Sequence, residues 1–281
     1  AFDPAALLGG PAPTLRRPHF IAIVASLTVA TVLARKSKGK VDGLVVEGPS
    51  AGGHNAPPRG RTRLDERGEP IYGDRDFPDL DGLAGLGLPF WLAGSYASPS
   101  RLQDALDAGA AGIQVGTAFA FCEESGLTPD LKRRVLREAC RGKAVVRTDP
   151  SASPTGFPFK VVQLAGTASG GGASRAGREV CDLGYLRHAY RRPDGRVGWR
   201  CPAEPERIYR RTGGRVEDTR GRACVCNGLL ANIGLGQVRR DGWREPPLVT
   251  SGSDLGILAR LAGPDGHDYS ASEVIDVLVA E

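Results

Sequence analysis

The sequence predicts an α/β protein whose first half holds a parallel sheet. Short apolar runs of strand length alternate with segments of helical composition in this half of the 281-residue chain. Such alternation is typical of parallel strands joined by crossover helices, either doubly wound or closed into a barrel. Only four strands are visible, a count that fits half of an eight-stranded (β/α)8 barrel.

The expected strands lie among glycines, as buried parallel strands commonly do, and cover residues 18–25, 41–46, 90–93 and 112–115. Helical composition follows the first strand to about Lys36. A helix is predicted from Ser98, a plausible N-cap followed by Pro99, to Gly109. Another helix is predicted in the same way, with Thr128 and Pro129 at its start and Gly142 at its end.

Beyond residue 142 the pattern changes. Residues 151–159 and 167–177 are rich in Ser, Gly and Pro and predict irregular surface segments. Short helices are expected near residues 206–211, 227–238, 254–261 and 271–279. We therefore expect a partial barrel domain over residues 1–142 and a mostly irregular or helical accessory region over residues 143–281.

Composition bounds the location and the partners. No apolar stretch reaches the roughly 18 residues that a membrane span needs, and no secretory signal is visible, so we expect a cytoplasmic protein without a membrane partner. The chain contains no methionine, which suggests a fragment. Residues 130–222 hold 21 Lys/Arg against 10 Asp/Glu, but no nucleic-acid-binding signature accompanies this charge, so we do not expect a nucleic-acid partner.

The string EGPSAGGHNAPPRG, residues 47–60, contains the first catalytic candidate. His54 stands behind Gly52 and Gly53 on the exit loop of the second strand, where glycine lets a flat ligand approach the backbone. An imidazole suits proton transfer near neutral pH. The alternative is a surface histidine in a flexible loop, which the rigid Pro57-Pro58 exit disfavours.

The next two strands each end in a glycine followed by a hydroxyl residue, Gly94-Ser95 and Gly116-Thr117. Loop amides at such positions can hold an anion. Two of these loops after consecutive strands suggest one shared phosphate site, and barrels often build that site after their last two strands. Tight turns without a ligand are the alternative.

Four cysteines lie in the second region and are candidate metal ligands: Cys181, Cys201, Cys224 and Cys226. They include only one CxC and no CxxC pair, so reduced thiols are the default expectation.

EGPSAGGHNAPPRG, followed by WLAGS and GAAGIQVGTAFAFCEESG, resembles the nitronate monooxygenase family, formerly called 2-nitropropane dioxygenases. The Cys-containing tail resembles a longer branch of that family. The resemblance implies a TIM barrel that holds FMN at its C-terminal mouth and oxidises alkyl nitronates, a small-molecule substrate, with O2. It places His54 at the catalytic histidine, Gly94, Ser95, Gly116 and Thr117 on the FMN-phosphate loops, and Gly52 and Gly53 near the flavin.

The chain departs from the family pattern in three places. The opening segment of the family is missing before Ala1, the loop over residues 49–88 is long, and the tail of about 140 residues lies outside the basic pattern. We expect this tail either to cover the active-site mouth or to mediate assembly, for example into a homo-oligomer. Two other functions remain open: a flavin-dependent enoyl-thioester reductase, and a non-catalytic module stabilised by a metal on the tail cysteines.

Overall fold

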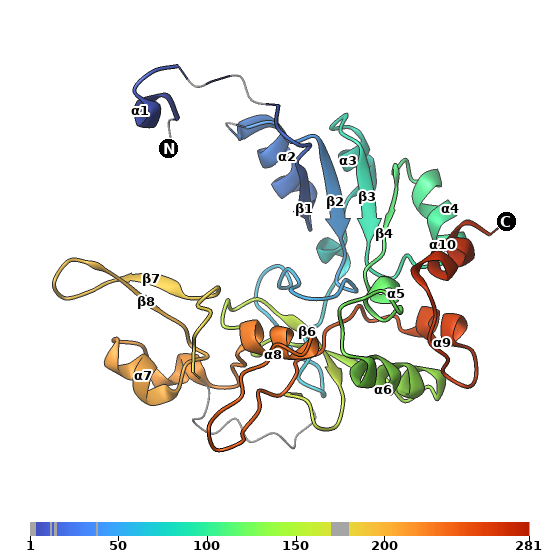
Figure 1. The fold of residues 1–281 in the computed structure, drawn as a ribbon. Coiled ribbons are helices and arrows are strands. Elements are labelled where there is room, and N and C mark those ends of the chain that lie inside the picture. The colour runs from blue at the N-terminus through green and yellow to red at the C-terminus, as the bar shows by residue number, and fades with distance from the viewer. Residues whose placement is uncertain (1–3, 12, 14–15, 38, 170–179, 281) are drawn as a thin grey trace.

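Four parallel strands form the sheet of the first half (Figure 1). This computed structural model describes residues 4–11, 13, 16–37, 39–169 and 180–280. The strands are β1 (Ile21–Val24), β2 (Gly43–Glu47), β3 (Phe90–Ala93) and β4 (Gly112–Gln114). They pair in the order β1-β2-β3-β4, each parallel to the next. A doubly wound sheet reverses its strand order at a switch point, whereas consecutive order is that of a barrel. The predicted α/β fold of half-barrel type is confirmed.

The described part of the first half contains six helices, of which the second, fourth and sixth lie close to the predicted positions, whereas the first, third and fifth were not predicted. They are α1 (Pro4–Leu8), α2 (Leu27–Lys36), α3 (Leu80–Ala84), α4 (Pro99–Asp107), α5 (Thr117–Ala120) and α6 (Pro129–Cys140), with a short 3-10 turn η1 (Asp74–Asp76). Ser98 caps α4, because its hydroxyl accepts from the Arg101 amide at 3.3 Å. Thr128 precedes α6 without a side-chain cap bond, and Pro129 occupies the first turn as predicted.

The second region contains two antiparallel strand pairs that the sequence did not predict. These are β5 (Val145–Asp149) with β6 (Phe159–Gln163), and β7 (His188–Arg191) with β8 (Val197–Arg200). Its helices are α7 (Glu206–Arg211), α8 (Val225–Asn232), α9 (Gly256–Ala262) and α10 (Ala271–Val279), with a 3-10 turn η2 (Val216–Thr219). Part of the predicted irregular segment 167–177 lies outside the described residues.

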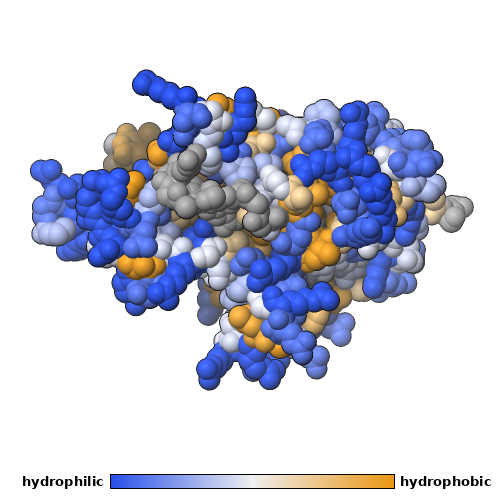
Figure 2. Space-filling model, turned by 90° about the horizontal axis from the view of Figure 1, so that it is seen from below, coloured by the Kyte–Doolittle hydropathy of each residue, from blue (hydrophilic) through white to orange (hydrophobic). Residues whose placement is uncertain are grey.

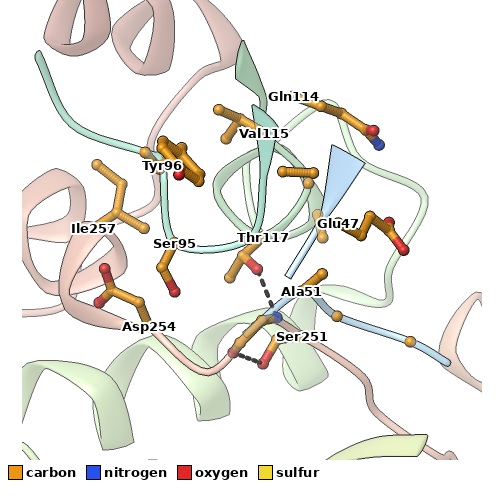
Figure 3. A pocket seen from close by; sticks show the side chains of 18 of the residues that line it. Glu47, Ala51, Ser95, Tyr96, Gln114, Val115, Thr117, Ser251, Asp254 and Ile257 are labelled. Carbon is orange, nitrogen blue, oxygen red and sulfur yellow. Dashed lines mark hydrogen bonds between the residues drawn. The ribbon is translucent and has the colours of Figure 1, made fainter. Parts of the chain in front are cut away.

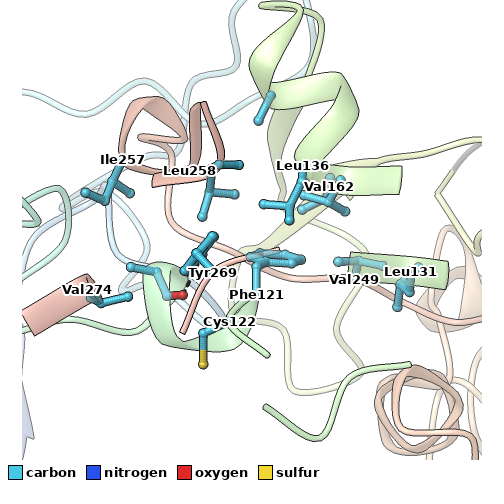
Figure 4. Close-up of a cluster of buried hydrophobic side chains, with 14 of the residues drawn as sticks. Phe121, Cys122, Leu131, Leu136, Val162, Val249, Ile257, Leu258, Tyr269 and Val274 are labelled. Atoms are coloured by element: carbon cyan, nitrogen blue, oxygen red, sulfur yellow. Dashed lines mark hydrogen bonds between the residues drawn. The ribbon is translucent and has the colours of Figure 1, made fainter. Parts of the chain in front are cut away.

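One hydrophobic core joins the two regions. Phe121 and Leu136 from the first region pack with Val162, Leu258 and Tyr269 from the second, as Figure 4 shows. The buried Tyr269 hydroxyl donates to the Ala118 carbonyl at 2.7 Å. Packing therefore crosses residue 142, and the division there into two domains stays a prediction.

A second core lies between the sheet and its helices, where Leu44, Leu83, Phe90 and Ala105 are fully or almost fully buried. Strand β1 forms one edge of this sheet. No helix in the described part of the chain is long and apolar enough to cross a membrane.

Candidate functional site

The loops that leave β2, β3 and β4 meet at the carboxyl edge of the sheet and line a cavity of about 370 Å³ (Figure 3). A volume of this size is typical of small-molecule sites. All six residues predicted to contact a cofactor line this one cavity: Gly52, Gly53, Gly94, Ser95, Gly116 and Thr117. The structure therefore brings together the loops that the sequence suggested as one shared site.

Close backbone packing builds the wall between the first two loops. Gly94 has a φ of +91°, and a Cβ there would lie 2.8 Å from the Ala51 amide nitrogen. Ser95 has a φ of +60°, and it is the only non-glycine residue with positive φ in the described part of the chain. Left-handed backbone costs energy for a residue with a Cβ, and such strain is often found at ligand sites.

The second region supplies the opposite wall. The Gly252 amide donates to the Thr117 hydroxyl at 2.9 Å, and the Gly53 amide donates to the Thr250 hydroxyl at 2.9 Å. A Cβ on Gly52 would lie 2.8 Å from the Ser251 carbonyl carbon, so this loop and the tail touch backbone to backbone.

Sequence reasoning missed this tail contribution to the cavity, which also includes Asp254 and Ile257. The only available signal is the Thr-Ser-Gly-Ser run at residues 250–253, between a buried apolar pair and a helix. Nothing local in that run indicates the loop against which it packs.

His54 lies beside the cavity loops but is not among the residues that line the cavity. Its Nε2 hydrogen-bonds the Ser153 hydroxyl at 2.6 Å, and its ring packs edge-on against Phe159 at 4.7 Å. Ser153 is completely buried and also hydrogen-bonds the Thr155 hydroxyl at 2.8 Å. Burial lowers the pKa of His54, so the neutral imidazole is the favoured form at neutral pH.

Glu47, at the end of β2, is a site residue that the sequence analysis did not single out. It lines both the main cavity and a neighbouring cavity of about 180 Å³. Burial raises the pKa of its carboxyl, which favours the protonated form. Figure 3 shows its side chain on the opposite side of the main cavity from Asp254.

An anion in this cavity would meet backbone amides rather than cationic side chains. Among the described residues that line it, the charged ones are Glu47 and Asp254, both acidic. Gly116 precedes α5, and a Cβ there would meet nothing within 4 Å, so the space in front of this backbone is open. Open backbone on one loop and left-handed turns on another fit the phosphate end of a mononucleotide.

The cysteines offer no metal centre in the described part of the chain, where no group of three or more His, Cys, Asp or Glu is placed to hold a metal ion. All six are free thiols, including the candidates Cys181, Cys201, Cys224 and Cys226. Burial raises the pKa of Cys224 to about 12 and that of Cys201 to about 11, which keeps both protonated at neutral pH.

The fold and the cavity define an α/β protein of barrel type with a ligand site at the carboxyl ends of its parallel strands. The family model for nitronate monooxygenase matches residues 10–153, about half of the chain and the part that contains most of the cavity loops. The chain belongs to the nitronate monooxygenase family.

Curated relatives match the same half. A Pseudomonas aeruginosa nitronate monooxygenase is 30% identical over 136 residues, which cover 48% of this chain and 36% of the relative. A Mycobacterium tuberculosis protein named (3aS,4S,5R,7aS)-5-hydroxy-7a-methyl-1-oxo-octahydro-1H-indene-4-carboxyl-CoA dehydrogenase is 28% identical over 142 residues, which cover 50% of this chain and 35% of that protein. The matched part thus spans about a third of the length of these relatives.

Solved structures are similar at low identity. FabK from Thermotoga maritima gives a TM-score of 0.48 at 16% identity, covering 93% of this chain and 60% of that one. Nitroalkane oxidase from Streptomyces ansochromogenes gives 0.45 at 18% identity, covering 94% and 57%.

Proposed function

We propose that this chain is part of an FMN-dependent oxidoreductase that oxidises alkyl nitronates or nitroalkanes with O2. The observation that carries the proposal is the single cavity lined by all six predicted cofactor residues. Membership of the nitronate monooxygenase family supports it. Residues 1–142 would supply the FMN-binding part, and residues 143–281 would close one wall of the site.

In this proposal the loops after β3 and β4 hold the FMN phosphate. The Gly94-Ser95 turn and the Gly116 backbone would offer amides, while Thr117 is fixed by its bond to Gly252. Gly52 and Gly53 would lie near the flavin. Bound flavin supplies the electron transfer, and the protein binds and orients the substrate.

His54 is the proposed acceptor of a proton from the carbon that bears the nitro group. Its lowered pKa supports the role, because a general base must be unprotonated at the working pH. Ser153 is the proposed orienting group, since its hydroxyl bonds Nε2 directly. With a nitroalkane as substrate, His54→Ala should lower turnover about 100- to 10,000-fold while flavin content stays near that of the wild type. An alkyl nitronate has already lost this proton, so its turnover should depend less on His54.

The cofactor is tested by an absorption spectrum of the purified protein, with and without added FMN. Gly116→Val should fold normally and retain less FMN, because a side chain there enters open space in front of the proposed phosphate loop. Gly73→Val is the control, since Gly73 also faces open space but does not line the cavity. Full flavin occupancy in Gly116→Val would contradict the proposed phosphate site.

The reaction is tested by O2 uptake with propionate 3-nitronate or a nitroalkane. A second candidate, a flavin-dependent enoyl-thioester reductase, is favoured by the similarity to the M. tuberculosis protein whose name describes a CoA-ester dehydrogenase. NADH oxidation that depends on an enoyl thioester, without nitronate-dependent O2 uptake, would select this alternative.

A further inference from the structure

A groove of about 1080 Å³ on the second region is lined by five arginines and no acidic residue. It lies between the β7–β8 hairpin and α7, which project together from the body of the molecule in Figure 1. The end of the molecule that holds them is predominantly hydrophilic in Figure 2. The arginines lie at the ends of β7, β8 and α7 or, for Arg192, directly after β7: Arg191, Arg192, Arg200, Arg210 and Arg211.

Arg200 is held rigidly in this groove. Its guanidinium carbon lies 4.6 Å from the centre of the Tyr190 ring and 5.4 Å from that of Tyr209, and Nη1 donates to the Thr212 carbonyl at 2.8 Å. Stacking of this kind fixes a guanidinium without neutralising its charge.

Two glycines make room for the rings that hold Arg200. Gly198 faces Tyr190 across the hairpin, and a Cβ there would lie 2.6 Å from the Tyr190 ring. A Cβ on Gly214 would collide with the Tyr209 ring in the same way. Glycine at these two positions therefore leaves space for the two tyrosine rings that stack on Arg200.

The charge of the groove is only partly neutralised. Arg192 lies 3.7 Å from Asp194, and Arg210 lies 3.8 Å from Glu206. Among the described residues, no carboxylate forms an ion pair with Arg191, Arg200 or Arg211. Because side chains alternate along a strand, the Arg191 side chain lies on the other face of the hairpin from Tyr190 and Arg200. Arg200, which is preorganised, and Arg211 line the same groove and give it a positive local field for a multivalent anion.

We propose that this groove binds a polyphosphate group, meaning two or more linked phosphates, whether as inorganic polyphosphate or as the phosphate chain of a nucleotide. Arginine forks match phosphate oxygens two at a time, and the use of arginine alone among the cationic lining residues favours this planar recognition. The proposal does not depend on the function of the flavin site, because the groove and the main cavity share no lining residue.

The test is isothermal titration of the full chain with pyrophosphate, tripolyphosphate and ADP, with citrate as a non-phosphate anion. We expect binding of the phosphate compounds at least about tenfold tighter than that of citrate, weakening steeply with added salt. ADP tighter than pyrophosphate would identify a nucleotide as the source, and tripolyphosphate tighter than ADP would identify inorganic polyphosphate. Citrate binding as tight as that of pyrophosphate would overturn the proposal.

The variant Arg211→Glu should weaken pyrophosphate binding at least about tenfold. Arg207→Glu is the matched control, because Arg207 is an exposed residue of the same helix α7 that does not line the groove. Equal losses in the two proteins, or no loss in either, would overturn the proposal. If Arg211→Glu does not fold, phenylglyoxal modification of the wild-type arginines, with and without tripolyphosphate, decides the question by mass spectrometry. Protection confined to the groove arginines supports the site, and absence of protection refutes it.

Discussion

The backbone amide of Gly252 donates a hydrogen bond of 2.9 Å to the hydroxyl of Thr117, although 135 residues separate them in the chain. Thr117 starts α5 after the fourth parallel strand, and Gly252 lies in the loop before α9. Both line the same cavity. One hydrogen bond therefore ties the proposed phosphate loop to the second region.

Thr117→Val should destabilise the protein by about 1–3 kcal/mol, because it leaves the buried Gly252 amide without its acceptor. It should also weaken FMN binding, since the loop loses its anchor. Urea unfolding and flavin titration measure the two effects. Thr31→Val is the control, because the Thr31 hydroxyl bonds only the Leu27 carbonyl within α2, and its removal should cost less. Equal losses of stability would show that the bond to Gly252 contributes nothing specific.

Gly52→Ala should destabilise the protein by about 1–3 kcal/mol through overpacking. The added methyl would lie 2.8 Å from the Ser251 carbonyl carbon and 2.9 Å from the Gly252 nitrogen, both rigid backbone atoms. Gly48→Ala in the same loop meets nothing within 4 Å and should leave the free energy of unfolding nearly unchanged. Thermal unfolding of both variants tests whether residues 251–252 pack tightly against this loop. Identical unfolding midpoint temperatures for the two variants would contradict such packing.

These contacts mark the limit of prediction from the sequence. The period of the apolar runs and the Ser98-Pro99 signal are local, so β3 and the start of α4 lie where they were expected. The hairpins β5–β6 and β7–β8 depend on pairing between strands, which composition does not encode. The part of the site built by the loops after β2, β3 and β4 could be predicted. Thr250 and Gly252 reach it through contacts between residues far apart in the chain, among them the Val162 amide bonded to the Val249 carbonyl and the packing of α9 on α6.

Ser153→Ala should lower turnover about tenfold, the effect of losing one hydrogen bond that orients His54, with KM and FMN content little changed. A positioning role also predicts an altered pH profile of kcat/KM, because the partner of the imidazole has changed. Ser151→Ala in the same turn is the control, since no bond joins Ser151 to His54. Loss of stability with an unchanged pH profile would assign Ser153 a purely structural role.

His54 should make the protein less stable in acid. Burial holds its folded-state pKa below the ordinary value of 6.5, so between the two values the unfolded chain binds more protons than the folded one. Stability from this group is therefore fully present above 6.5 and is lost as the pH falls through the folded pKa. His54→Gln removes this dependence. Urea unfolding from about pH 7.5 to about pH 5 should show wild-type stability falling relative to the variant; parallel curves would refute the shift.

Lys132→Met should cost about 2–4 kcal/mol of stability, because the buried Lys132 ammonium holds three carbonyls of the loop between α5 and α6. Its Nζ donates to the carbonyls of Cys122 and Glu123 at 2.9 Å each and to that of Ser125 at 3.3 Å. Methionine fills a similar volume without donating, so these carbonyls lose a charged partner. Lys143→Met, at an exposed position just after α6, is the control and should change little. Urea unfolding of the two variants compares them, and equal stability would show that water replaces the ammonium at all three carbonyls.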